Sequence, residues 1–426
     1  MISPPRRFAI VAIRHRAYGA AMQKARITTV EFVALFSLLT SLTAISLDAV
    51  LPALPAMGDA LAVADANTTQ LIVTMFIFGM VFGELLFGPL CDAIGRKAAI
   101  LLGLALFCVG AVIAMTAQTM EQILIGRIIQ GIGVSGPKIG SRALIRDRFA
   151  GEAMAQIMSL IFTVLILVPM VAPAIGQLLL TLAGWQAIFV LYLAAAVVGG
   201  AWLTVRQPET LPPERRIPIA PRRLFRNAVR IMRHSHVLAY TGAAGLTFGA
   251  QLLFLSTAQS MFADIYGRAT SFPFYFAVIA LAVGIAAFTN SRLVMGWGMA
   301  RMVALALYGL GASSGLLLLA ALITAGAPPF HLFMALLSLM FFCVGILFSN
   351  LNALAMVSLG EIAGLGAALI ASVSSLIAVG FAVSLGWFYA ETVTPVALGF
   401  LAAALGAFAL TCRVRYREDL PVVPIA

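Results

Sequence analysis

Long uninterrupted apolar stretches dominate this sequence, and short polar segments separate them. Each stretch has the length of about 20 residues that an α-helix needs to cross the hydrocarbon core of a bilayer. The apolar residues do not alternate with polar ones, so lipid-facing β-strands are not expected. The pattern predicts membrane-spanning helices at residues 30–51, 69–90, 98–117, 122–143, 154–179, 185–205, 237–258, 272–290, 302–324, 330–355, 365–389 and 394–412.

A segment rich in proline and arginine, residues 206–236, divides these helices into two sets of six. Its composition excludes a membrane span and is typical of a linker. We therefore predict an all-α membrane protein with two six-helix bundles, at residues 30–205 and 237–412. Residues 1–29 and 413–426 are expected to be basic tails outside the membrane.

Basic residues, which give a net charge of +11, concentrate in the two tails and the linker. The short segments between helices alternate between a set with most of the remaining arginine and lysine and a set with most of the acids. This positive-inside pattern predicts a bacterial inner membrane protein with both termini cytoplasmic, and contact with anionic lipids in place of nucleic acid. No cleavable signal peptide is expected, because the first apolar run continues into a full span; a native start at Met22 stays open.

The overall composition supports the membrane interpretation. Hydrophobic residues make up 62% of the chain and charged residues only 10%, whereas soluble domains have about a quarter charged residues. The four cysteines and four histidines show no paired metal-ligand spacing, and no histidine lies beside a plausible nucleophile. We therefore expect no metal, disulfide, cofactor or catalytic site.

Four ionisable residues fall inside predicted spans, and all belong to the first set: Asp48, Glu84, Arg127 and Lys138. A charge at that depth costs at least a few kcal/mol, so it normally faces a partner or a water-filled path. Arg127 and Lys138 are about three helical turns apart and share one helix face. The sequence therefore places any ion-coupling machinery in the first half.

A tight polar turn follows the second predicted helix and contains Gly88, Asp92, Gly95, Arg96 and Lys97. A carboxylate and two cations in such a turn can latch neighbouring helix ends, and glycine permits close backbone approach. Ordinary positive-inside charge is the alternative interpretation.

This turn, residues 88–97, resembles the loop signature G-x-L-x-D-x-x-G-R-K/R of the major facilitator superfamily. Residues 126–133 are similar to its R-x-x-Q-G-x-G pattern, and residues 169–176 resemble the kinked motif of its proton-driven exporters. Residues 48–55 resemble the end of the first span in the Bcr/CflA drug-resistance group. The chain departs from that group at Glu84, where glutamine is common, and at Lys138, where a small or apolar residue is usual.

The resemblance implies a proton-coupled secondary active transporter that exports drugs or other small amphipathic molecules by alternating access. A dedicated exporter of one natural product, such as a siderophore, and a nutrient importer remain alternatives. An enzyme or a channel is disfavoured, because the spans lack clustered catalytic ligands and filter-like rings. We expect a monomer whose partners are a small-molecule substrate, protons and lipids.

Each candidate residue has an expected role. Asp48 exchanges the proton, Arg127 tunes its proton affinity, and Glu84 is the competing proton site. A structural salt bridge is the alternative for Arg127, and extension of the side chain to the membrane surface is the alternative for Lys138. The resemblance implies a helix kink at Pro169, Pro173 and Gly176. The residues expected to line the substrate cavity are Ser41, Gln130, Val134, Lys138, Gln251 and Asn350.

Overall fold

The computed structural model describes residues 27–63, 65–357, 359 and 363–414, and helices make up most of this part of the chain. The first half contains α2 (Thr29–Asp48), η1 (Leu51–Ala53), α3 (Leu54–Ala60), η2 (Ala66–Gln70), α4 (Leu71–Ile94), α5 (Arg96–Met115), α6 (Met120–Arg148), α7 (Gly151–Ala183) and α8 (Gln186–Arg206). The second contains η3 (Pro213–Arg215), α9 (Pro221–Arg233), α10 (Ser235–Ser260), η4 (Met261–Ile265), α11 (Phe272–Trp297), α12 (Met299–Ile323), α13 (Phe330–Met356), α14 (Ala363–Gly386) and α15 (Thr394–Cys412).

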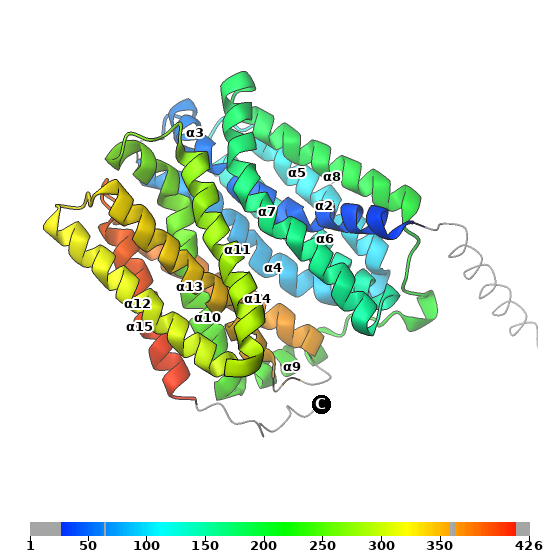
Figure 1. The fold of residues 1–426 in the computed structure, drawn as a ribbon. Coiled ribbons are helices and arrows are strands. Elements are labelled where there is room, and N and C mark those ends of the chain that lie inside the picture. Colours follow the sequence, from blue (N-terminus) through cyan, green and yellow to red (C-terminus); the bar gives the residue numbers. More distant parts are fainter. Residues whose placement is uncertain (1–26, 64, 358, 360–362, 415–426) are drawn as a thin grey trace, which may run out of the picture.

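Twelve helices in the described part of the chain are long enough to span a bilayer. Within the described residues, eleven are long and apolar enough to do so by length and composition alone. The twelfth is α6, which is about 43 Å long at 1.5 Å per residue, carries several cations, and lies among the others (Figure 1). The predicted all-α, twelve-helix fold is confirmed. The first span is longer than expected, because η1 and α3 extend it to Ala60.

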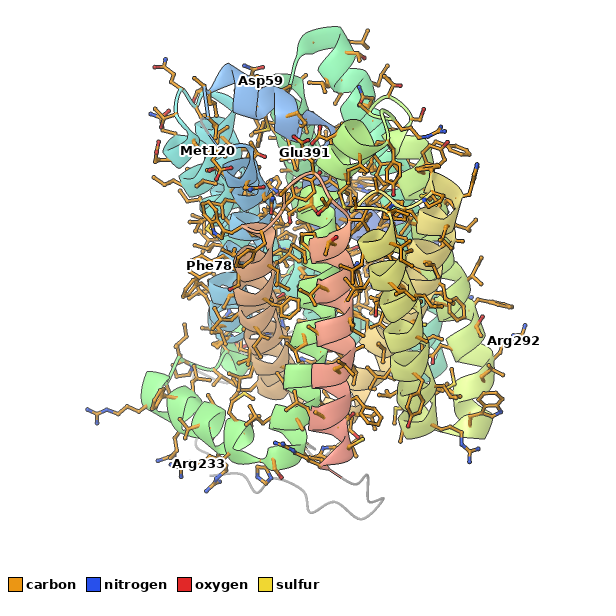
Figure 2. The ribbon with its side chains drawn as sticks, turned by 90° about the vertical axis from the view of Figure 1, so that its left-hand side faces the viewer. Asp59, Phe78, Met120, Arg233, Arg292 and Glu391 are labelled. Atoms are coloured by element: carbon orange, nitrogen blue, oxygen red, sulfur yellow. The ribbon has the colours of Figure 1, made fainter. Side chains whose placement is uncertain are left out.

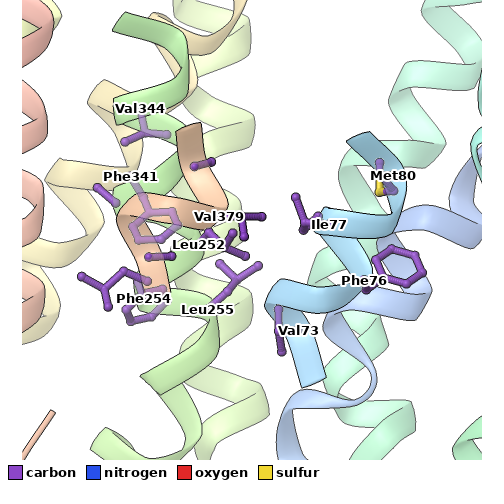
Figure 3. Packing of buried hydrophobic residues seen from close by; sticks show 14 of the residues in the cluster. Val73, Phe76, Ile77, Met80, Leu252, Phe254, Leu255, Phe341, Val344 and Val379 are labelled. Atoms are coloured by element: carbon purple, nitrogen blue, oxygen red, sulfur yellow. The ribbon is translucent and has the colours of Figure 1, made fainter. Parts of the chain in front are cut away.

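The helices form two six-helix bundles that lie side by side (Figure 1). In the first bundle α6 packs against α4 and α5, and in the second α10 packs against α13, α14 and α15. The bundles meet where α4 contacts α14 and α10, and where α7 contacts α11. This interface is apolar near its middle: Val73 and Ile77 of α4 point towards Leu255 of α10 and Val379 of α14 (Figure 3).

Glycines set the close packing around α6. A Cβ atom on Gly131 would collide with the backbone oxygen of Phe76 in α4. A Cβ atom on Gly133 would collide with the backbone nitrogen of Phe107 in α5. Small residues allow helix backbones to approach this closely inside membranes. As a result, two neighbouring helices fix the rotation of α6, and with it the direction of its charged side chains.

The two ends of the molecule differ in charge. Asp59 and Glu391 lie at one end, called here the acidic end, and Arg233 lies at the opposite, basic end (Figure 2). At the acidic end, the Asn67 side chain donates to the Tyr389 carbonyl at 3.1 Å, and the Gln70 amide donates to the Gly386 carbonyl at 3.3 Å. These bonds join η2, which leads into α4 of the first bundle, to the end of α14 and the residues just after it. The hollow beside them has a volume of about 10 Å³, room for a single water at most.

Candidate functional site

Asp48 is the last residue of α2 and is only 5% exposed. Its carboxylate forms no hydrogen bond or ion pair with any described residue. The fully buried Tyr192 of α8 lies near enough to interact with it electrostatically, and the Tyr192 hydroxyl donates to the Ser46 carbonyl at 3.3 Å. Asp48 is therefore a buried carboxylate without a bonded partner.

Arg127 of α6 is fully buried, and backbone oxygens hold its guanidinium. Its Nε donates to the Ile72 carbonyl of α4 at 2.9 Å, and its Nη2 donates to the Ser46 carbonyl of α2 at 2.9 Å. Its Nη1 donates to the Gln130 side chain at 3.2 Å, and the guanidinium lies 4.4 Å from the centre of the Phe76 ring. The salt bridge considered for Arg127 is absent from the described residues. Arg127 instead ties α2 and α4 to α6.

The structure does not pair Arg127 with Asp48. The two residues are nevertheless close along the fold, because Arg127 bonds to the carbonyl of Ser46, in the same last turn of α2 as Asp48. A shift of α2 relative to α6 would therefore change the distance between the carboxylate and the guanidinium. The expected tuning of Asp48 by Arg127 stays a prediction.

Glu84 of α4 and Lys138 of α6 form an ion pair, with 2.5 Å between Nζ and Oε1. The Glu84 side chain is 2% exposed and the Lys138 side chain 27% exposed. The second carboxylate oxygen, Oε2, has no hydrogen-bond partner among the described residues, although the charge of Arg142 acts on Glu84 from the next turn of α6. The two departures from the group pattern are thus partners, and Lys138 turns to Glu84 and does not extend to the membrane surface.

The remaining candidate cavity residues lie in several places. Gln130 bonds Arg127, and Val134 and Ser41 are buried on α6 and α2. In the second bundle, Gln251 of α10 is half-buried, while Asn350 of α13 donates to the Asn290 side chain of α11 at 2.6 Å. Gln130 is therefore bonded to Arg127, as expected for residues that share a site. Among the described residues, neither Gln251 nor Asn350 is bonded to a charged side chain.

Helix α7 continues without a break through Pro169 and Pro173. Gly176, on the same helix, lies so close to the backbone of Ala49 that a Cβ atom would collide with its carbonyl oxygen. The motif at 169–176 therefore packs α7 against the end of α2, directly beside Asp48. Whether the helix bends there during transport stays a prediction.

The polar turn links four helices of the first bundle. Arg96 bonds Asp92 of α4 at 2.5 Å and Asp147 of α6 at 3.0 Å, and the Lys97 ammonium donates to the Thr204 carbonyl of α8 at 2.8 Å. Gly95 has a φ of 108°, which favours glycine. Gly88 has open space around the position of a Cβ atom, so the close approach expected of the glycines is wrong for this one.

Glu209, in the segment after α8, is a residue that the sequence analysis missed. Its carboxylate accepts hydrogen bonds from the backbone nitrogens of Arg96 at 3.0 Å and Lys97 at 3.1 Å, the first two residues of α5. It also accepts from the backbone nitrogens of Thr210 and Leu211. Glu209 therefore caps α5 and fastens the segment after the first bundle to the polar turn. The available signal was an acid in an otherwise arginine-rich segment.

Comparison with known proteins shows the family of this chain. The family model described as "Major Facilitator Superfamily" matches residues 36–382. The chain belongs to the Major Facilitator Superfamily. A bicyclomycin resistance protein homolog of Haemophilus influenzae is 31% identical over 350 residues, which cover 81% of this chain and 86% of that protein.

Two further similarities are informative about this superfamily member. A chloramphenicol resistance protein of Pseudomonas aeruginosa is 29% identical over 63% of this chain and 63% of its own length. The crystal structure of a D-xylose-proton symporter matches with a TM-score of 0.69 at 15% identity, covering 90% of this chain and 98% of that one. The second likeness supports the fold alone.

We expect Glu209→Ala to loosen the first turn of α5. Loss of a helix N-cap costs about 0.5 to 2 kcal/mol, so hydrogen–deuterium exchange of the amides in residues 96–99 should rise roughly tenfold. Glu214→Ala is the matched control, because Glu214 is an exposed acid in the same segment. Equal exchange in the two variants would contradict the capping role.

Proposed function

We propose that this chain is a proton-coupled secondary transporter that exports small amphipathic molecules by alternating access. The observation that carries the proposal is the position of Asp48. It is a buried carboxylate without a bonded partner, and the residues that follow it, in η1, contact α10 of the second bundle. A proton bound or lost at Asp48 thus changes the charge next to a contact between the bundles.

The physical basis of coupling is the cost of an ionised carboxylate at this depth. Asp48 avoids that cost either by binding a proton or by approaching a cation. Arg127 is the candidate cation, because it bonds the last turn of α2, and the carbonyls of Ile72 and Ser46 retain it in the present arrangement. A rearrangement that frees Arg127 towards Asp48 would expel the proton, and return to this arrangement would bind one. Two such states are what proton coupling requires.

Export is favoured over import because the relatives are named for resistance to bicyclomycin and chloramphenicol. We infer that the substrate is a small molecule of this general kind and that it crosses chemically unchanged. A dedicated natural-product exporter remains the second candidate, because Glu84 and Lys138 depart from the drug-resistance group.

We infer that the basic end faces the cytoplasm, together with both termini. Helix α9 contributes the exposed Arg222, Arg226 and Arg233, and Arg233 lies at this end (Figure 2). The polar turn adds Arg96, whose backbone nitrogen is bonded to Glu209 in the segment before α9. Anionic lipid headgroups of the cytoplasmic leaflet attract such residues.

The native cysteines test this orientation. Cys412 is exposed at the end of α15, whereas Cys91 and Cys343 are buried and Cys108 is partly exposed. A membrane-impermeant maleimide should label the wild type in everted vesicles and not in intact spheroplasts, and Cys412→Ser should lose most of the label. Strong labelling of Cys412 in spheroplasts would reverse the orientation.

Asp48→Asn should abolish proton-driven transport, because the amide cannot exchange a proton. In a pump-deficient host, wild type should raise resistance to some members of a broad drug panel, and Asp48→Asn should raise none at matched expression. Everted vesicles with an imposed proton gradient should take up the same compounds only with the wild type. The exposed Asp59→Asn serves as the control and should behave as wild type.

Proton-driven uptake by Asp48→Asn would disprove the role of Asp48. A wild type that protects against no drug in the panel would favour the dedicated natural-product exporter.

A further inference from the structure

Glu84 lies on the face of α4 that is turned towards the second bundle. Val73, Ile77 and Glu84 are spaced four and seven residues apart, so they fall within about 40° of one another around the helix. Val73 and Ile77 point towards Leu255 and Val379 of the second bundle (Figure 3). Phe82 and Leu86, on another face of α4, are exposed and point outward, as expected for lipid contact. Glu84 therefore lies on the helix face that meets the second bundle, about two turns beyond Ile77.

Lys138 also faces away from lipid. On α6, glycines pack against α4 and α5, and Ile125, between those two contacts, is 52% exposed. Lys138 lies on the opposite side of the helix, on the stripe that contains Arg127 and Val134. The 27% exposure of its side chain is therefore exposure towards the middle of the molecule. Lys138 lies about 15 Å along the axis from the basic end of α6 at Arg148.

The charges around this point are unequal. Glu84 contributes one negative charge, and Lys138 and Arg142 contribute two positive charges. Of the ion pair, the ammonium is the accessible partner, since the carboxylate is almost completely buried. The facing helices α10 and α14 contain no ionisable side chain within their described lengths except His236 and Tyr240, both near the start of α10. A ligand that enters between the bundles would thus meet a partly exposed cation followed by an apolar surface.

We propose that Lys138 binds the anionic group of an amphipathic organic anion, whose apolar part lies against the interface around Ile77 and Val379. The anion replaces Glu84 as the partner of the ammonium, and Arg142 retains the freed carboxylate. Glu84 neutralises Lys138 while the site is empty, which avoids the cost of an isolated buried charge. This inference rests on the proposed transport function and specifies the class of substrate.

A matched set of fluorescent probes tests the inference on the purified full-length protein. Dansylglycine is anionic, dansylamide neutral and dansylcadaverine cationic, and all three share one fluorophore. Wild type should bind dansylglycine about tenfold more tightly than the other two, as a charge-assisted hydrogen bond in a partly buried site allows. Arg301→Gln removes an exposed cation outside the site and should leave this preference unchanged.

The two partners give opposite predictions, which separates ligand binding from a structural ion pair. Lys138→Gln should lose the preference for dansylglycine, and Lys138→Arg should keep it. Glu84→Gln should increase the affinity for dansylglycine, because the ammonium no longer has a competing carboxylate. A purely structural pair predicts that Glu84→Gln and Lys138→Gln lower the unfolding temperature alike without changing the relative affinities.

Equal binding of the three probes by wild type, preference for dansylcadaverine, or failure of all three to bind would overturn the inference. The binding measurement uses no proton gradient. Anion-selective binding without any proton-driven transport would therefore disprove the proposed function and leave this site assignment standing. If Lys138→Gln transports normally and keeps the anion preference of the wild type, the site assignment is disproved and the proposed function stands.

Discussion

The cost of placing ionised groups inside a bilayer-spanning bundle governs the arrangement of this protein. Helix α6 carries Arg127, Lys138 and Arg142 between apolar neighbours, and each must find electron-rich groups within the protein. Arg127 finds backbone carbonyls of α2 and α4, and Lys138 finds Glu84 of α4. The glycines that draw α4 and α5 onto α6 bring these partners within reach. In the first bundle, the charged side chains therefore depend on close helix packing for their partners.

Asp48 has no bonded partner among the described residues, although it is buried. It lies just before η1, which contacts the second bundle. Near the acidic end of the junction between the bundles, Asn67 and Gln70 bond across it to the carbonyls of Tyr389 and Gly386, at the end of α14. At the basic end, Arg96 and the cap by Glu209 hold the helix ends of the first bundle together. These contacts tie the helices of the first bundle to one another, and we propose that this bundle moves as one body against the second.

Much of this fold follows from the sequence, because spans of apolar residues are recognisable without tertiary information. The twelve spans were predicted correctly. The end of the first span was not, since Pro52 and Pro55 occur at the starts of η1 and α3 and permit the helical path to continue. Helix α6 was recognised as a span despite its cations, because the residues between them are small or apolar.

The partners of the charges were harder to predict. Glu84 and Lys138 are far apart in the sequence, and their pairing depends on the rotation of two helices that glycine contacts determine. The ligands of Arg127 are backbone carbonyls, which no side-chain pattern encodes. Glu209 caps a helix more than a hundred positions earlier in the chain, so its role appears only when the segment after α8 returns to the polar turn.

The central claim is that Asp48, and not Glu84, is the carboxylate that gains and loses the transported proton. Infrared difference spectroscopy of the purified protein between acidic and alkaline pH measures this directly through the C=O stretch of a protonated carboxyl group. If Asp48 exchanges the proton, this band should disappear in Asp48→Asn and persist in Glu84→Gln. A band that persists in Asp48→Asn and disappears in Glu84→Gln would contradict this claim.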